Sequence, residues 1–210
     1  MIYVYEPGQP VIALVGDDPV ELEVGSSYVD DGATALDSED GNITDSIVVV
    51  NNVNTSDVGT YTVQYNVADS DGKAAQEVTR TVYIKDNIKP VITLLGDNPQ
   101  FIPDDGSYVE HGATASDNYD ENLSDGISID ATNVNTDTLG AYTVKYNVTD
   151  SSGNIADQVT RNVVVYYSPP TITLTGDSVI YVEVGTGYSD LGATASDFED
   201  GDLTADIITT

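Results

Sequence analysis

Short runs of alternating apolar and polar residues make up most of the chain. In the first third of the sequence these runs are VIALV, VELEV, GATAL, IVVV, YTVQYNV and VTRTVYI. Turn-forming residues separate them at intervals of about 8–12 positions, which is typical of an antiparallel β-sandwich. No segment keeps the period of an amphipathic helix. The pattern therefore predicts an all-β protein.

The runs return at a fixed interval, so the chain is a tandem repeat. PVIALVGD at 10–17, PVITLLGD at 90–97 and PTITLTGD at 170–177 each begin 80 residues after the previous copy. Farther along, GTYTVQYNVADSDGKAAQEVTRTV (59–82) matches GAYTVKYNVTDSSGNIADQVTRNV (140–163). The repetition predicts four segments: the closing strand and linker of a preceding repeat at 1–7, one repeat at 8–88, a second at 89–168, and the N-terminal half of a third, truncated repeat at 169–210.

One feature indicates which kind of sandwich the repeats form. The segments DVGTYTV and TLGAYTV follow, the second more loosely, the approach to strand F of immunoglobulin domains, where a tyrosine hydroxyl bonds back to the preceding loop. Tyr61 and Tyr142 would make this tyrosine corner; the alternative is that they are ordinary core aromatics. Val63 and Val144 would then stand where the second cysteine of the disulfide lies, and the chain has no Cys. We expect sandwiches held by packing alone.

The motifs P-x-I-T-L-x-G-D, Y-x-D-x-G-A-T-A-x-D, G-x-Y-x-V-x-Y-N-V-x-D-S-x-G and V-T-R-x-V together resemble the bacterial surface immunoglobulin-like repeats, which are similar to hyalin repeats. The resemblance covers almost the whole chain. It implies tandem immunoglobulin-like β-sandwich repeats of about 80 residues in a large secreted or cell-surface protein. It also implies a stalk or adhesive role and no catalytic activity.

The charge of the chain is strongly one-sided, with 36 acidic and 6 basic residues and a formal net charge of -30. Repulsion on this scale opposes folding unless cations screen or bind the acids. Nucleic acids and anionic membranes are poor partners, because no basic patch meets their phosphates. The chain has no apolar run long enough for a transmembrane helix and no N-terminal signal-peptide pattern, so a secreted parent would carry its signal outside this segment.

Acidic residues concentrate in one loop that recurs as ATALDSEDGNIT, ATASDNYDENLS and ATASDFEDGDLT. In an immunoglobulin-like sandwich this B–C loop, the F–G loop and the incoming linker emerge at the same end. Crowded carboxylates repel, and calcium takes about six to eight oxygen ligands, so this oxygen-only set favours Ca²⁺. His111, the sole His, has no soft partner nearby for a transition metal. The predicted metal ligands are Glu6, Asp37, Glu39, Asp40, Asn42, Asp69, Asp71, Asp86, Asp117, Asp120, Asn122, Asp150, Asp197, Glu199, Asp200 and Asp202.

The repeats are not equivalent in these loops. The second repeat has Tyr119 in place of Glu39, and the linker before the third repeat, VYYSPP, has no acid, so weaker ligation is expected there. The acids that precede GATA are Asp30, Glu110 and Asp190. A further hypothesis is that they bind an ion held by a neighbouring repeat.

Other readings of the acids and polar loops remain open. A surface adapted to high salt is the main alternative to calcium. Catalysis is disfavoured, because the acids recur in every repeat without a companion His, Lys or Ser. Sequons that could carry glycan occur at Asn42, Asn54, Asn122 and Asn147.

The sequence therefore predicts an extracellular or cell-surface stalk or adhesin module, stiffened by calcium, that spaces or presents a functional domain. Its partners would be the neighbouring repeats of the same chain. The alternative is a subunit of a self-assembling filament joined by strand complementation, since a half-repeat cannot bury its sheet alone. In that case the third repeat would be poorly ordered or completed by another copy of the chain.

Overall fold

A computed structural model describes residues 8–104, 106–197 and 200–210. The predicted closing strand and linker at 1–7 lie outside these residues. Within them, every regular element is a strand or a short 3-10 helix, which confirms the all-β prediction. The described residues divide into two compact units: one holds those within 8–90 with 117–121 and 149–155, and the other holds those within 91–116, 122–148 and 156–210.

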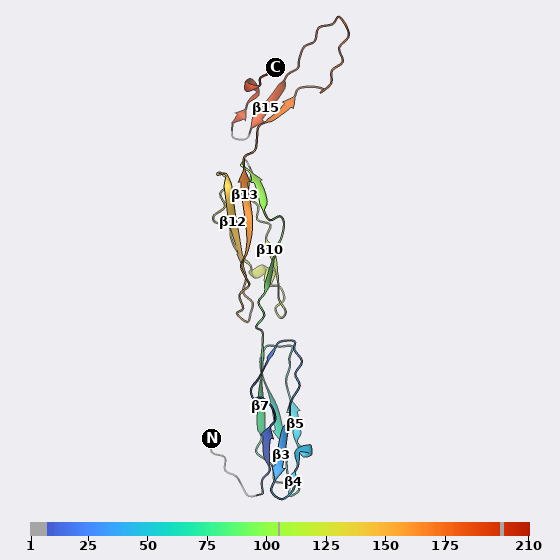
Figure 1. Cartoon of the computed structure of the whole chain (residues 1–210), viewed down its shortest axis with the longest axis vertical. Helices are drawn as coiled ribbons and strands as arrows, with labels where there is room; N and C mark the ends of the chain where they lie inside the picture. Colours follow the sequence, from blue (N-terminus) through green and yellow to red (C-terminus); the bar gives the residue numbers. More distant parts are fainter. Residues whose placement is uncertain (1–7, 105, 198–199) are drawn as a thin grey trace. The chain divides into compact units, whose positions relative to one another are not determined.

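The first repeat is a sandwich of two sheets (Figure 1). One sheet has the order β1-β3-β4 and the other the order β2-β7-β6-β5. Strand β2 pairs in parallel with β7, whereas the other pairs are antiparallel. The elements are β1 (Val11–Leu14), β2 (Val20–Glu23), β3 (Ala33–Asp37), β4 (Gly41–Asn42), η1 (Thr44–Ser46), β5 (Val48–Asn51), β6 (Gly59–Asn66) and β7 (Val78–Lys85).

The second repeat has the same plan. Its sheets have the orders β10-β8 and β11-β12-β13-β9, and β9 pairs in parallel with β13. The elements are β8 (Val91–Leu94), β9 (Gln100–Pro103), β10 (Ala113–Ser116), η2 (Leu123–Gly126), β11 (Ser128–Asp130), β12 (Gly140–Asn147) and β13 (Val159–Tyr166).

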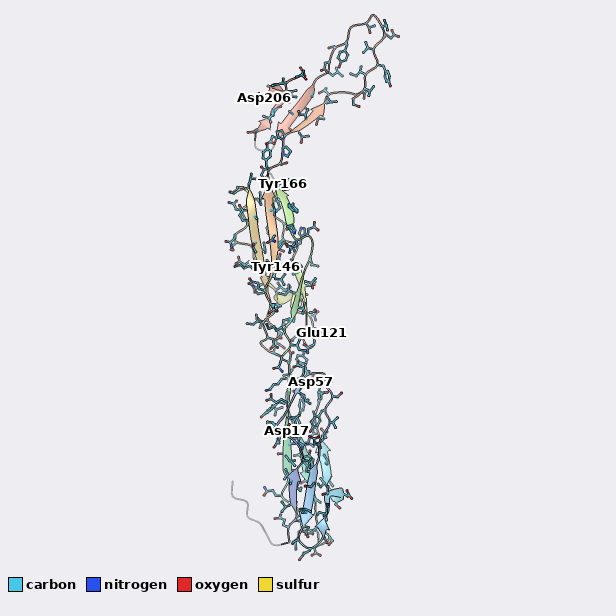
Figure 2. The ribbon with its side chains drawn as sticks, viewed as in Figure 1. Asp17, Asp57, Glu121, Tyr146, Tyr166 and Asp206 are labelled. Atoms are coloured by element: carbon cyan, nitrogen blue, oxygen red, sulfur yellow. The ribbon has the colours of Figure 1, made fainter. Side chains whose placement is uncertain are left out.

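The two cores are built from equivalent positions. Alternation along β6 and β12 turns Val63, Tyr65, Val144 and Tyr146 inward, where each is 0% exposed. The tyrosine corner is present in both repeats: the Tyr61 hydroxyl donates to the carbonyl of Asp57 at 3.0 Å, and the Tyr142 hydroxyl to that of Thr138 at 2.8 Å. Asp57 and Tyr146 are labelled in Figure 2. The prediction of an immunoglobulin-like sandwich without a disulfide is confirmed.

The third repeat has a three-stranded sheet, β14-β15-β16. In its described part, Ala195 is the only buried hydrophobic residue, while Ile172 and Leu174 are 64% and 60% exposed. The apolar face of this sheet is therefore uncovered. The elements are β14 (Thr171–Leu174), β15 (Ala193–Asp197), β16 (Gly201–Asp202) and η3 (Thr204–Asp206).

A buried arginine crosses the interior of the first repeat. Arg80, 1% exposed, points inward from β7 and donates to Asp30 Oδ1, to the Tyr65 hydroxyl at 3.1 Å and to the carbonyls of Val15 and Gly32. Burial acts to raise the pKa of Asp30, but hydrogen bonds from Tyr65, Tyr28 and Gly32 and the charge of Arg80 lower it overall. Asp30 therefore has its partners inside its own repeat.

The second repeat has a related arrangement, in which Tyr146 stands between the arginine and Glu110. Arg161, 0% exposed, donates to the Tyr146 hydroxyl at 3.0 Å and to the carbonyls of Asp97, Leu95 and Gly112. The Tyr146 hydroxyl in turn donates to Glu110 Oε1 at 2.7 Å. The acid that precedes GATA thus anchors a tyrosine of the core in both complete repeats.

Candidate metal centre

Four aspartates gather at one place in the first compact unit. Asp86, Asp117, Asp120 and Asp150 each offer a carboxylate oxygen, and these oxygens all lie within 4.8 Å of one another. All four belong to this unit, because its bounds include 117–121 and 149–155. We call this group the four-aspartate cluster.

Asp86 is the deepest of the four and directly follows β7. It is 6% exposed, and its Oδ1 accepts a hydrogen bond from the Ile88 amide at 3.2 Å. Its Oδ2 is buried and has no hydrogen-bond partner among the described residues. Leaving a carboxylate oxygen buried and unpaired costs free energy, and a bound cation would remove that cost.

The loop after β10 holds Asp117 and Asp120 in a tight turn. Asp117 Oδ2 accepts hydrogen bonds from the amides of Tyr119 at 2.9 Å and Asp120 at 3.2 Å. This leaves Asp117 Oδ1 buried and without a partner in the part of the chain that the structure describes. Asp120 Oδ2 accepts from the Ser151 amide at 3.0 Å and the Ser151 hydroxyl at 2.9 Å, which ties this loop to the loop after β12.

The loop after β12 positions Asp150, which is 7% exposed. Asp150 Oδ1 accepts from the Asn154 amide at 2.7 Å, and Oδ2 accepts from Asn154 Nδ2 at 2.8 Å. The same Nδ2 also donates to the main-chain carbonyl of Asp86 at 3.1 Å. Asn154 therefore joins two of the four aspartates.

The electrostatics of the cluster favour a cation. Burial raises the pKa of Asp86, and the neighbouring charges of Asp117 and Asp150 raise it further, while the hydrogen bond from the Ile88 amide and the polar group of Ser152 act in the opposite direction. The carboxylates of Asp86, Asp117 and Asp150 therefore repel one another, and this repulsion destabilises the folded state. A divalent cation would replace that repulsion with attraction.

The donor set is suited to calcium rather than to a transition metal. Calcium binds carboxylate and carbonyl oxygens at about 2.3–2.6 Å in flexible geometry, whereas magnesium demands a near-octahedral site and keeps most of its water. The cluster offers carboxylate oxygens and contains neither His nor Cys. The residues present therefore fit Ca²⁺.

In the first repeat, the equivalent loops adopt the same local geometry. Asp37 Oδ1 accepts from the amides of Glu39 at 2.7 Å and Asp40 at 2.9 Å, and both Asp40 oxygens accept from Ser70. Asp69 Oδ1 accepts from the amides of Asp71 and Lys73. Asp37 Oδ2 and Asp69 Oδ2 are buried without a partner among the described residues. These acids, however, do not form a second group comparable to the four-aspartate cluster within the described ranges.

The remaining predicted ligands lie elsewhere or have local partners. Asn42 Oδ1 and Asp202 Oδ1 accept from the amides of Thr44 and Thr204, so each closes a turn before a 3-10 helix. Asn122 belongs to the second compact unit, and its φ of 61° places it in the left-handed region. In the third repeat, Asp197 Oδ1 accepts from the Asp200 amide at 3.4 Å. Glu6 and Glu199 lie outside the described residues.

Comparison with known proteins gives one family. The family model described as "Bacterial surface protein, Ig-like domain" matches residues 12–84 and 92–165. The two matched segments are Ig-like modules in tandem. Among the described residues, no helix has the length and apolar character that a membrane crossing requires.

Two curated proteins are similar to this chain over part of their length. An 81.3 kDa protein of Acholeplasma phage L2 is 33% identical over 186 residues, which is 83% of this chain and 24% of that protein. The pesticidal crystal protein Cry22Aa of Bacillus thuringiensis is 33% identical over 126 residues, which is 59% of this chain and 17% of that protein. The chain thus spans a quarter or less of the length of these relatives.

Solved structures resemble it more distantly. The lipoprotein BT2262 of Bacteroides thetaiotaomicron is 19% identical with a TM-score of 0.34, covering 77% of this chain and 85% of that one. The fibronectin(III)-like modules of Clostridium thermocellum CbhA are 15% identical with a TM-score of 0.29, covering 74% of this chain and 94% of that one.

Proposed function

Because this chain belongs to the bacterial surface protein Ig-like domain family, we propose that it is a calcium-stabilised stalk or adhesin module that spaces or presents a functional domain at the cell surface. The observation that carries the proposal is Asp86 Oδ2 in the four-aspartate cluster, which is buried and has no hydrogen-bond partner among the residues that the structure describes. The modules themselves are proposed to have no catalytic role.

The proposed action of calcium follows from where its ligands stand in the sequence. Asp86 ends the first repeat, whereas Asp117, Asp120 and Asp150 come from two loops of the second. One ion bound to all four would hold the linker and both loops together. Each repeat of a tandem array contacts only its neighbours, so rigidity in such a stalk has to be built at every boundary in turn.

Thermal unfolding in calcium, in magnesium and in chelator, all at the same high salt, tests the proposal. A ligand present at about 100 times its Kd stabilises the folded state by about 2.7 kcal/mol. We expect a rise in Tm that is specific to calcium and is lost in Asp117→Ala and Asp120→Ala. Asp45→Asn is the matched control, because Asp45 is an exposed acid outside the cluster. Three coincident curves would favour a surface adapted to salt.

The filament alternative draws support from the uncovered sheet of the third repeat, where Ile172 and Leu174 are exposed. In a filament, strands of another copy would pair with the edge of that sheet by β-strand addition and so bring further apolar residues against its exposed face. Light scattering after size exclusion distinguishes the two functions. The mass of a single chain across the micromolar range argues for the stalk, and a mass that grows with concentration argues for the filament.

A further inference from the structure

Two residues at equivalent positions of the F–G loops differ in charge. The matching segments 59–82 and 140–163 align Asp69 with Asp150 and Lys73 with Asn154. Both residues donate a backbone amide to the aspartate four positions earlier, each at 2.7 Å. Beyond that shared bond, their side chains do different things.

Asn154 builds the four-aspartate cluster without adding charge. Its Nδ2 bonds Asp150 Oδ2 at 2.8 Å and the Asp86 carbonyl at 3.1 Å, so the amide fixes one ligand against another. The site still contains Asp86 Oδ2, which is buried and has no hydrogen-bond partner in the described part of the chain, in a residue that is 6% exposed. The negative charge of the cluster is thus left for an external cation.

Lys73 brings a cation of its own to the loops of the first repeat. Its Nζ lies 3.6 Å from Glu39 Oε2, in the loop that also holds Asp37 and Asp40. Side chains of both partners are partly exposed, at 45% and 62%, so this pair alone adds little stability. Its effect is instead on the charge of the loops, because an ammonium group lowers the attraction of nearby carboxylates for a second cation.

We propose that the residue at this loop position determines how each acidic loop pair is neutralised: Asn154 leaves its cluster open to a divalent cation, and Lys73 supplies an internal ammonium that disfavours one. The inference rests on the proposed function, since it assumes calcium at the four-aspartate cluster. It makes Asn154 a positioning residue rather than a ligand. It also explains why homologous loops that share equivalent aspartates need not attract a cation equally.

Exchange of the two residues tests this inference by titration calorimetry with calcium chloride. Asn154→Lys is expected to weaken calcium binding at the cluster by about tenfold or more, because the new ammonium competes at close range. Its Tm in chelator is expected to equal or exceed that of the wild type, an effect that a purely structural role for Asn154 would not produce. Asn154→Gln keeps the amide and the charge, and it is expected to retain calcium binding within about tenfold.

Lys73→Asn is the reciprocal change, and it is expected to raise the affinity of the first repeat's acidic loops for calcium, because it removes the competing ammonium group. Circular dichroism identifies any variant that has not folded. If Asn154→Lys does not fold, the calcium affinity of Asn154→Gln is compared with that of the wild type instead. If wild type binds no calcium, the proposed function fails. If wild type binds and Asn154→Lys binds equally well, or if Asn154→Lys is destabilised in chelator as much as in calcium, only the present inference is overturned.

Discussion

Replacement of Arg80 by Met tests whether the buried arginine network holds the first sandwich together. Met fills a similar length of side chain but removes the charge and every donor. Asp30 Oδ1, the Tyr65 hydroxyl and two main-chain carbonyls would lose a partner. The perturbation is therefore almost purely electrostatic.

The expected cost can be worked out from the burial of the two charges. Removing one partner of a buried ion pair destabilises proteins by about 3–5 kcal/mol. Arg80 is 1% exposed, but the Asp30 side chain is 17% exposed and keeps hydrogen bonds from Tyr65 at 2.5 Å and Tyr28 at 3.1 Å. Water and the two tyrosines can therefore still solvate the Asp30 carboxylate. We expect the free energy of unfolding to fall by about 3 kcal/mol, the lower end of that range.

Urea unfolding at neutral pH measures this loss, with Arg161→Met as the matched change in the second repeat. The cost of Arg80→Met should be the same in calcium and in chelator, because the contacts of Arg80 lie outside the four-aspartate cluster. Adding Asp30→Asn to Arg80→Met should recover part of the loss, since it removes the stranded charge. A cost of Arg80→Met below about 1 kcal/mol would refute the reasoning.

Three further predictions concern the tyrosine corner, pH and the cluster. Tyr61→Phe and Tyr142→Phe should each lower the free energy of unfolding, measured in urea, by about 1 kcal/mol, which is the contribution of one hydrogen bond. If neither variant changes the free energy of unfolding, the tyrosine corner does not stabilise the fold. The pKa of Asp30 is lower in the folded state than in the unfolded chain. Its contribution to the free energy of unfolding is therefore complete above the unfolded pKa of about 3.9 and is lost as the pH falls through the folded pKa. Asp30→Asn should therefore flatten the decline of stability with acid, measured by urea unfolding from neutral pH to about pH 3. Asp86 has a raised pKa, so Asp86→Asn should raise Tm in chelator and lower it in calcium; a shift of the same sign in both conditions contradicts a cation site.

Much of the fold follows from local pattern. The run VTRTVYI predicts a strand, and β7 occupies Val78–Lys85. The equivalence of the repeats predicts the second sandwich from the first, and sandwich topology predicts that Asp86, Asp117 and Asp150 converge. What topology does not supply is the exact set of neighbours. Tyr119 stands in the same loop as Asp117 and Asp120, and its amide donates to Asp117 Oδ2, a contact that topology alone does not predict.

The arginine network was missed although its signal is in the sequence. Alternation along VTRTVYI places Arg80 on the same face as Val78, Val82 and Ile84, which is the core face. An arginine at a core position needs polar partners, and Asp30 supplies the carboxylate among those of Arg80. Asn154 could not be found in the same way, because its importance depends on two hydrogen bonds that no pattern of carboxylates predicts.

The parallel pairing of β2 with β7 has a mechanical consequence. Four residue pairs join the two strands, from Val20 with Val82 to Glu23 with Lys85. In a parallel pair, tension between the N-terminal end of β2 and the C-terminal end of β7 pulls the strands along each other. The hydrogen bonds between them then share the load and must fail together, rather than opening one after another as in a peeled hairpin. The pairing of β9 with β13 gives the second repeat the same resistance to stretching.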